Sequence, residues 1–401
     1  MRLGIIMRLK NVVRMLLYSL ILWTGYKSYA YFFDYVAPTL TLQAIEDGMW
    51  FSGDIHCNVS MDKPSYLTIS VDNNPVVADV YIPNDQKTHD IIIPITTLAD
   101  GVHHLRFFSV DTSYNKNSSL KDVTFYVDNS PLQAAFLGDS HIKVLQGRTL
   151  KIQFQANKEI EQAKVHALAE FYDCFPVSKN QNMYECYIPI SCEEKPSEYM
   201  FCVEVCDRVG NKISLDNKFE IVACDFKKQA IQIDPVKIQE EKAKGKTESE
   251  FEEHVMQLVN NSPQEKLWKG SFLPPVQIDK VTCEYGTIRT SQERGRYMHK
   301  ALDVITKPKS VIWAPQNGII VLKDRYDFSG NTVVVDHGHG IFSLFYHLDD
   351  FADIEVGQKV AQGKPLGTLG KTGYATGYHL HWEMRVNNTQ VDPMQWVNET
   401  F

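Results

Sequence analysis

Two histidines near the C-terminus, in the segment GYHLHWEMR, have the residue types and spacing of a metal site. His379 and His381 are separated by one residue, and polar and apolar residues alternate around them. Strict alternation is typical of a half-buried β-strand, because alternate side chains share one face. Neutral imidazole is a good zinc ligand and a strand holds its direction firmly, so this pair is a candidate for metal binding.

A second pair with the same spacing, His337 and His339, lies between glycines. Glycines in this arrangement predict a turn after a valine-rich strand. A His-x-His pattern also arises easily by chance, so spacing alone does not separate the two pairs. Their neighbours do, since six of the 13 histidines lie between His299 and His381.

A His-x-x-x-Asp pattern formed by His299 and Asp303 supplies further candidate ligands. Zinc sites that perform hydrolysis combine three His or carboxylate ligands with an open position for water. His299, Asp303 and one of the two strand histidines complete such a set. The other strand histidine and His347 would then be spare imidazoles, suited to proton transfer at neutral pH. For His347 alone, a histidine that caps an aromatic strand is the alternative.

Residues 271–395 resemble the lysostaphin-type or LytM zinc metallopeptidases, which cleave peptide cross-links in bacterial peptidoglycan. The segments that carry the resemblance occur in the order of the family: VTCEYGTIR, MHKALDV, WAPQNGII, GNTVVVDHG, FYHL, VGQKVAQGKPLG and GKTGYATGYHLHWEMR. The resemblance implies an antiparallel β-sheet catalytic domain, which we place at residues 269–401.

Applied to the matching positions, the resemblance implies that His299, Asp303 and His381 bind one Zn²⁺ ion. It also implies that His347 and His379 are the catalytic pair beside the metal. Which of these two histidines is the general base stays open.

Departures from the family pattern remove no ligand. Ala301 stands between His299 and Asp303 where glycine is usual, and Cys283 and Tyr285 vary the opening motif. The glycine-turned hairpins also resemble biotinyl and lipoyl carrier domains, but the region lacks the tripeptide around a modified lysine. A non-catalytic LytM-like regulator that binds cell wall or activates amidases is the alternative function, although such proteins have lost zinc ligands.

The N-terminal segment predicts export to the cell envelope. An apolar run from Met15 to Tyr26 follows four basic residues: Arg2, Arg8, Lys10 and Arg14. This order is typical of membrane insertion with the following chain outside the cytoplasm. If the helix continues to Phe33, residues 1–34 form an uncleaved single-pass anchor, through which the protein contacts the membrane. A cleaved signal peptide and a protein secreted to the periplasm are the alternative.

Between this segment and the catalytic domain, residues 36–128 and 129–224 are predicted to form two immunoglobulin-like β-sandwiches. An Asp-x-x-x-Asn-Lys pattern begins at Asp111 and again at Asp207, a period that suits such a unit. Turn chemistry explains the pattern more simply than calcium binding. The second module contains six of the eight cysteines, which predicts disulfides in an oxidising compartment, with a structural metal site as the alternative.

Residues 225–268 are rich in Lys, Glu and Gln, which predicts a charged, solvated linker with one helix. The apolar stripe of this helix is Ser249, Phe251, Val255 and Leu258. With 41 basic and 49 acidic residues, the net charge of -8 argues against a nucleic-acid partner. The sequence therefore predicts a mainly β, membrane-anchored zinc endopeptidase at the periplasmic face of a bacterial envelope, with peptidoglycan peptides as substrate.

Overall fold

The protein is seen in a computed structural model that describes residues 2–84, 88–138, 141–178, 181–232, 234–291 and 295–401, without the side chains of residues 2–9. The basic side chains of Arg2 and Arg8 therefore lie outside the described part. The chain is mainly β, as predicted, and divides into two compact units. One consists of Met1–Pro131 with Arg208–Asn211, and the other of Leu132–Asp207 with Lys212–Phe401.

The first unit contains a long helix, α1 (Arg2–Phe32), followed by two sheets. In the described residues, one sheet has the order β1-β3-β6 and the other the order β2-β8-β7-β4-β5, and the buried side chains of both form one apolar cluster. The strands are β1 (Leu40–Gln43), β2 (Met49–Phe51), β3 (Ile55–Met61), β4 (Ser65–Val71), β5 (Asn74–Ile82), β6 (His89–Ile93), β7 (Gly101–Asp111) and β8 (Ser118–Val127).

Helix α1 contains the segment that was predicted to enter the membrane. Within the part of the chain that the structure describes, however, no helix combines the length and the apolar character that crossing a bilayer requires. The helix was correctly predicted, but the membrane anchor is not supported.

The second unit begins with two more sheets, of orders β10-β17-β16-β12-β13 and β14-β15-β11-β9, which share one buried core. No disulfide joins the eight cysteines, all of which lie in the described residues, so the predicted disulfides are not supported. The immunoglobulin-like assignment of both modules stays a prediction. The strands are β9 (Ala134–Leu137), β10 (Ile142–Leu145), β11 (Thr149–Ala156), β12 (Ile160–Ala167), β13 (Glu170–Asp173), β14 (Phe175–Pro176), β15 (Met183–Pro189), β16 (Glu198–Asp207) and β17 (Lys212–Val222).

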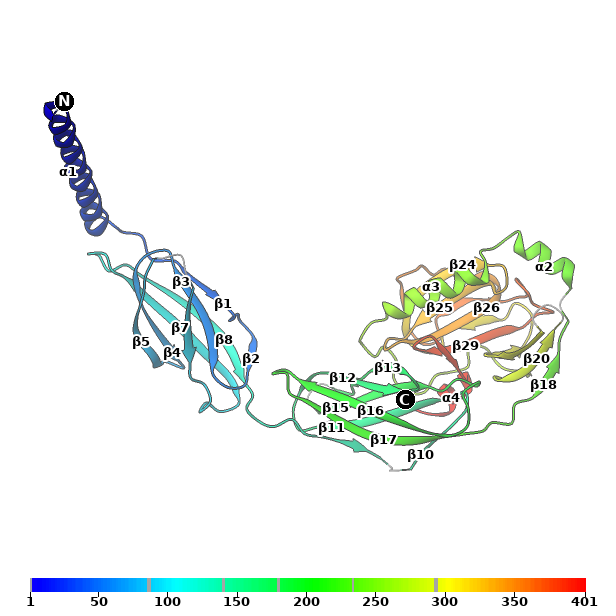
Figure 1. The fold of residues 1–401 in the computed structure, drawn as a ribbon. Helices are drawn as coiled ribbons and strands as arrows, with labels where there is room; N and C mark the ends of the chain where they lie inside the picture. Colours follow the sequence, from blue (N-terminus) through cyan, green and yellow to red (C-terminus); the bar gives the residue numbers. More distant parts are fainter. Residues whose placement is uncertain (1, 85–87, 139–140, 179–180, 233, 292–294) are drawn as a thin grey trace. The chain divides into compact units, whose positions relative to one another are not determined.

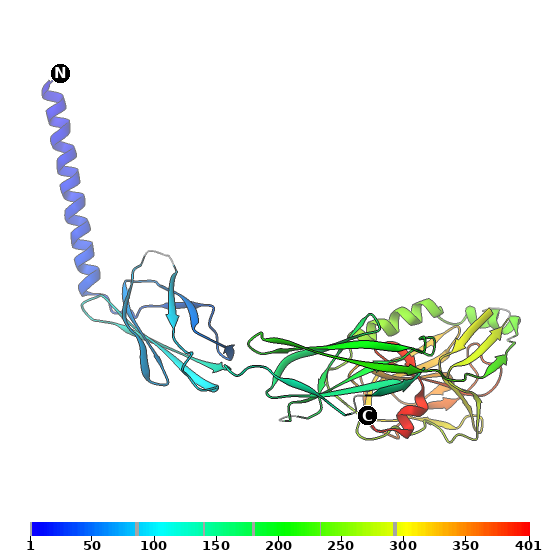
Figure 2. The same ribbon diagram turned by 60° about the horizontal axis from the view of Figure 1, so that its bottom comes forward.

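The predicted linker contains a strand, β18 (Lys228–Ala230), and two helices, α2 (Pro235–Lys242) and α3 (Glu248–Asn260), where we expected one helix. A capping box of Thr247 and Glu250 starts α3. Phe251 and Val255 of α3 are fully buried against the catalytic sheet, across which the helix lies in Figures 1 and 2. The apolar stripe of this helix was predicted, and the structure shows that the stripe packs on a sheet distant in sequence.

A ten-stranded sheet carries three of the predicted functional residues, Asp303, His347 and His381. Its main path through the described residues is β19-β22-β29-β26-β25-β24-β27, with β23, β28 and β30 attached and every pairing antiparallel. The strands are β19 (Lys280–Cys283), β22 (Leu302–Ile305), β23 (Val311–Trp313), β24 (Gly318–Tyr326), β25 (Gly330–Asp336), β26 (Ile341–Phe351), β27 (Lys359–Val360), β28 (Pro365–Leu369), β29 (Leu380–Val386) and β30 (Thr389–Val391). A smaller sheet joins β18 to β20 (Thr287–Ser291) and β21 (Gly295–His299), and α4 (Pro393–Asn398) follows the large sheet.

Strand β29 shows the predicted alternation of apolar and polar side chains, but it is not half-buried, because Glu383 and Arg385 on the polar face are buried as well. Trp382 and Met384 on its apolar face are fully buried in the main core. His381 lies on the opposite face, paired with Asp303 of β22 on one side and with Tyr346 of β26 on the other. His379 precedes the first residue of β29, so only one histidine of the pair belongs to the strand itself.

Candidate active site

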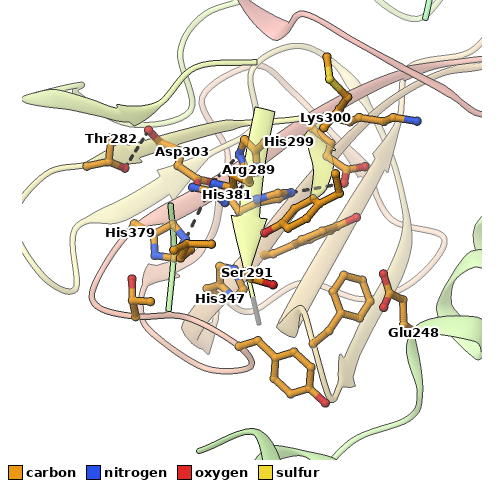
Figure 3. Close-up of a pocket in the computed structure, with 18 of the residues that line it drawn as sticks. Glu248, Thr282, Arg289, Ser291, His299, Lys300, Asp303, His347, His379 and His381 are labelled. Atoms are coloured by element: carbon orange, nitrogen blue, oxygen red, sulfur yellow. Dashed lines mark hydrogen bonds and ion pairs between the residues drawn. The ribbon is translucent and has the colours of Figure 1, made fainter. Parts of the chain in front are cut away.

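All five residues that were predicted to form the site line one cavity of about 1020 Å³. Figure 3 shows their side chains directed toward one another from strands β21, β22, β26 and β29 and from the loop before β29. Residues of α2 and α3 also line the cavity, including Lys242, Glu248 and Glu252. The site therefore extends beyond the catalytic sheet.

Two predicted metal ligands, His299 and His381, converge on a carboxylate oxygen of the third, Asp303. His299 Nε2 lies 3.1 Å from Asp303 Oδ1, and His381 Nδ1 lies 2.9 Å from the same oxygen. His299 is 3% exposed, and its Nε2 has no hydrogen-bond partner among the described residues. A buried, unsatisfied imidazole nitrogen beside a carboxylate is costly unless something else binds it. The donor set, two imidazoles and one carboxylate, fits a zinc ion.

Charge at this site favours a cation. Burial alone would raise the pKa of Asp303, but His299 and His381 hold the pKa of this carboxyl well below its usual range. Burial lowers the pKa of His299 to about 4, so its ring is neutral near pH 7. Burial also opposes a charge on His381, yet its hydrogen bonds to Asp303 and Glu383 raise its pKa to about 9. Two carboxylates thus create a position where positive charge is stabilised.

Arg289 of β20 contacts two of the proposed ligands, Asp303 and His299, at atoms other than Asp303 Oδ1 and His299 Nε2. Its Nη2 donates to Asp303 Oδ2 at 2.7 Å, and its Nη1 lies 2.9 Å from His299 Nδ1. The sequence places Arg289 in the opening motif, but we predicted no role for it. Cys283, which varies the opening motif, is buried and offers its sulfur within 4.8 Å of ligand atoms of His299 and Asp303.

The two predicted catalytic histidines lie together at the edge of this group. The ring centroids of His347 and His379 are 4.7 Å apart, and His379 Nε2 lies 3.9 Å from Asp303 Oδ1. Each ring directs Nδ1 at a backbone carbonyl, that of Thr372 at 2.8 Å for His347 and that of Gly377 at 3.0 Å for His379. Burial lowers the pKa of both. A neutral ring that donates from Nδ1 leaves its Nε2 lone pair available to accept a proton.

The loop that supplies these carbonyls is held by helix α2. Lys237 Nζ donates to the carbonyls of Lys371 at 3.0 Å and Ala375 at 2.6 Å. Because Thr372 lies between these two residues, the contact fixes the segment that orients His347. Sequence reasoning did not find Lys237, since α2 was not predicted.

The second His-x-His pair is outside the cavity, in agreement with its assignment to a turn. His337 bonds to the Asn317 carbonyl at 2.7 Å and to Ser343 Oγ at 2.9 Å. His339 stacks on Phe175 of β14, with ring centroids 3.7 Å apart. Both rings therefore have structural contacts away from the site, whereas His299, His379 and His381 lie close to Asp303.

A buried His-Asp-His group beside two neutral imidazoles is the arrangement of a metal-dependent hydrolase. Residues 297–393 match the sequence model of Peptidase family M23, so the C-terminal part of the chain contains a domain of this family. The individual roles of the five residues remain predictions.

Similar curated proteins include two peptidases and one activator. Over 127 residues the chain is 31% identical to the Peptidoglycan DD-endopeptidase ShyC of Vibrio cholerae and 30% identical to the DD-carboxypeptidase/endopeptidase Mpg of Neisseria meningitidis; each match covers 31% of this chain and 29% of the relative. Over 174 residues it is 26% identical to the Murein hydrolase activator EnvC of Escherichia coli, covering 39% of this chain and 41% of EnvC. The chain thus matches less than a third of the length of the first two relatives.

Among solved structures, the crystal structure of a putative peptidase M23 from Pseudomonas aeruginosa is similar with a TM-score of 0.45 and 23% sequence identity. The similarity covers 63% of this chain and 94% of that chain.

Proposed function

We propose that the protein is a zinc-dependent endopeptidase that hydrolyses peptide cross-links of bacterial peptidoglycan. The observation that carries the proposal is the convergence of His299 and His381 on Asp303, with the buried Nε2 of His299 left unsatisfied among the described residues. The M23 match supports a peptidase. The relatives named as peptidoglycan endopeptidases support this substrate and a location in the cell envelope, on its periplasmic side.

In this proposal His299, Asp303 and His381 hold the zinc ion. When bound, zinc supplies Lewis acidity, which favours attack of water on a peptide carbonyl. Arg289 neutralises the outer oxygen of Asp303 and keeps that carboxylate in place.

His347 and His379 are proposed to perform the proton transfers. With Nδ1 of each bonded to a backbone carbonyl, Nε2 accepts a proton from the attacking water or donates a hydrogen bond to the developing oxyanion. Burial keeps both rings neutral before reaction, as a general base requires. Both rings are oriented by a backbone carbonyl at Nδ1, so either ring suits the role of general base or of oxyanion donor.

A regulator without activity is the second candidate, favoured by the similarity to the activator EnvC. Retention of a complete donor set and of both neutral imidazoles favours hydrolysis instead. The two functions differ in one observable, because a regulator would leave isolated peptidoglycan uncut and would stimulate a separate amidase.

Two variants of the full chain test the assignment of roles. His381→Ala should lose zinc and hydrolysis together, because it removes a ligand. His347→Ala should keep zinc while hydrolysis of isolated peptidoglycan falls about 10²-fold or more, as expected for loss of a general base or acid. His166→Ala is the control, since His166 is exposed on β12 of the second module. Equal loss of zinc in the first two variants, or full activity of His347→Ala, would contradict the assignment.

A further inference from the structure

Helix α3 lies outside the region matched by the peptidase family, yet a chain of charged side chains connects it to His381. His381 Nε2 lies 3.3 Å from Glu383 Oε1, and Arg385 Nε donates to Glu383 Oε2 at 2.8 Å. The two terminal nitrogens of Arg385 donate to both carboxylate oxygens of Glu252 on α3, at 2.7 and 2.9 Å. The order is therefore His381, Glu383, Arg385, Glu252.

The alternation of β29 explains why three of these residues lie in a row. His381, Glu383 and Arg385 occupy every second position, so they share one face of the strand. Glu383 is 7% exposed and Arg385 1% exposed. A buried guanidinium needs compensating charge. Glu383 supplies one carboxylate and Glu252 the other, in a bidentate geometry that also fixes direction.

The carboxylate of Glu383 holds one edge of the His381 ring, while the other edge faces the proposed metal position. His381 Nδ1 lies 2.9 Å from Asp303 Oδ1. On the opposite edge, His381 Nε2 lies 3.3 Å from Glu383 Oε1, and the other oxygen of Glu383 accepts from Arg385. Such a contact to a carboxylate orients a metal-binding histidine and increases its basicity.

Aromatic packing connects the same helix to the same histidine by a second route. Phe251, next to Glu252 on α3, meets Tyr346 edge-on, with ring centroids 5.5 Å apart and an interplanar angle of 89°. Tyr346 stacks on His381 at 4.7 Å and 10°. Phe251 and Tyr346 are both buried, so neither ring is free to turn away.

We propose that α3 is a positioning element of the metal site, in which Glu252 holds the ring direction of His381 through Arg385 and Glu383. The Phe251–Tyr346 packing sets the plane of the same ring. The functional unit then begins at or before Thr247, the N-cap of α3, rather than at the start of the family match. This inference rests on the proposed zinc site.

The test compares zinc affinities of full-length variants. Glu252→Gln removes the charge but preserves the shape, and Glu253→Gln is the matched control, because Glu253 is an exposed neighbour on the same helix. Zinc dissociation constants are measured at pH 7.5 by competition with a chromogenic chelator. We expect Glu252→Gln to bind zinc about tenfold more weakly than the wild type, as for loss of an outer-sphere partner, and Glu253→Gln to bind within about twofold of it.

Thermal melting and circular dichroism separate positioning from folding. A purely structural role would lower the melting temperature of Glu252→Gln without changing its zinc affinity, and that result would overturn the proposal. If Glu252→Gln fails to fold, Arg385→Lys provides the second variant, since lysine keeps the charge but not the bidentate contact; an unchanged affinity there would also overturn it. A wild-type protein that binds zinc but leaves peptidoglycan intact would refute the proposed function and leave this inference standing.

Discussion

Replacing Asp336 with asparagine should make the second unit less sensitive to pH. Asp336 ends β25 and is 2% exposed. It accepts hydrogen bonds from the Gly338 amide at 2.8 Å and from Ser262 Oγ, just beyond α3, at 2.9 Å. Burial exceeds the effect of these bonds and raises the pKa of Asp336 from 3.8 to about 6.

The direction of the effect follows from proton binding. Between pH 4 and 6 the folded state holds a proton on Asp336 that the unfolded state has lost, so stability falls as pH rises through this range. The full pKa shift lowers the free energy of unfolding by about 3 kcal/mol above pH 6. About 1 kcal/mol of this loss is already present at pH 4.5. Asparagine has no such titration. The unfolding free energy of Asp336→Asn minus that of the wild type should therefore be about 2 kcal/mol larger at pH 7.5 than at pH 4.5.

Urea unfolding of the wild type and of Asp336→Asn, followed by tryptophan fluorescence at both pH values, measures this difference. Comparing the two pH values removes any constant cost of burying the amide N–H, because that cost is the same at each. Ser262→Ala is the control, since it removes one hydrogen bond but leaves the carboxyl group. A stability difference between wild type and Asp336→Asn that stays constant within about 0.5 kcal/mol from pH 4.5 to 7.5 would refute the reasoning.

Two further variants test contacts within the second unit, one away from the site and one beside it. Lys266→Met should lower the free energy of unfolding by about 3 kcal/mol, because the buried Glu185, 2% exposed, loses the cation 2.8 Å away. Urea unfolding measures this loss, and a loss below about 1 kcal/mol would contradict the prediction. Gly330→Ala should lower turnover about tenfold or more while zinc affinity is kept, since Gly330 has a φ of +65° and an added Cβ would overlap Thr372, whose carbonyl orients His347. Steady-state kinetics beside zinc titration measures the second effect, and an unchanged kcat would exclude it.

Which residues would meet at the site was largely predictable, because the five predicted residues belong to local patterns and to motifs that occur in the order of the family. Their individual roles stay predictions. Alternation around His381 correctly predicted a strand with an apolar face at Trp382. Position relative to the strand was less predictable, as His379 lies just before β29 and is directed by the Gly377 carbonyl. Strand boundaries depend on pairing with neighbours, which a single sequence does not display.

Contacts between distant segments were not predictable. Phe251 was recognised as part of an apolar stripe, but its burial depends on Tyr326 and Tyr346, whose proximity arises only in the folded sheet. In the sequence, nothing distinguishes Lys237 and Glu252 from the other charged residues of segment 225–268. Their partners, the carbonyls of the 371–375 loop and Arg385, lie more than a hundred residues away. Charge composition therefore predicted a linker with a helix, but not that the helix packs on the catalytic sheet.

The central claim is zinc-dependent cleavage of a peptide cross-link, and a defined cross-linked muropeptide dimer tests it most directly. The full chain is incubated with the dimer after zinc loading, after removal of zinc with a chelator, and after zinc is restored, and the products are identified by mass spectrometry. We predict monomers with one new amine and one new carboxylate in the first and third samples and intact dimer in the second. Intact dimer in all three samples, with the protein folded and zinc-loaded, would contradict it.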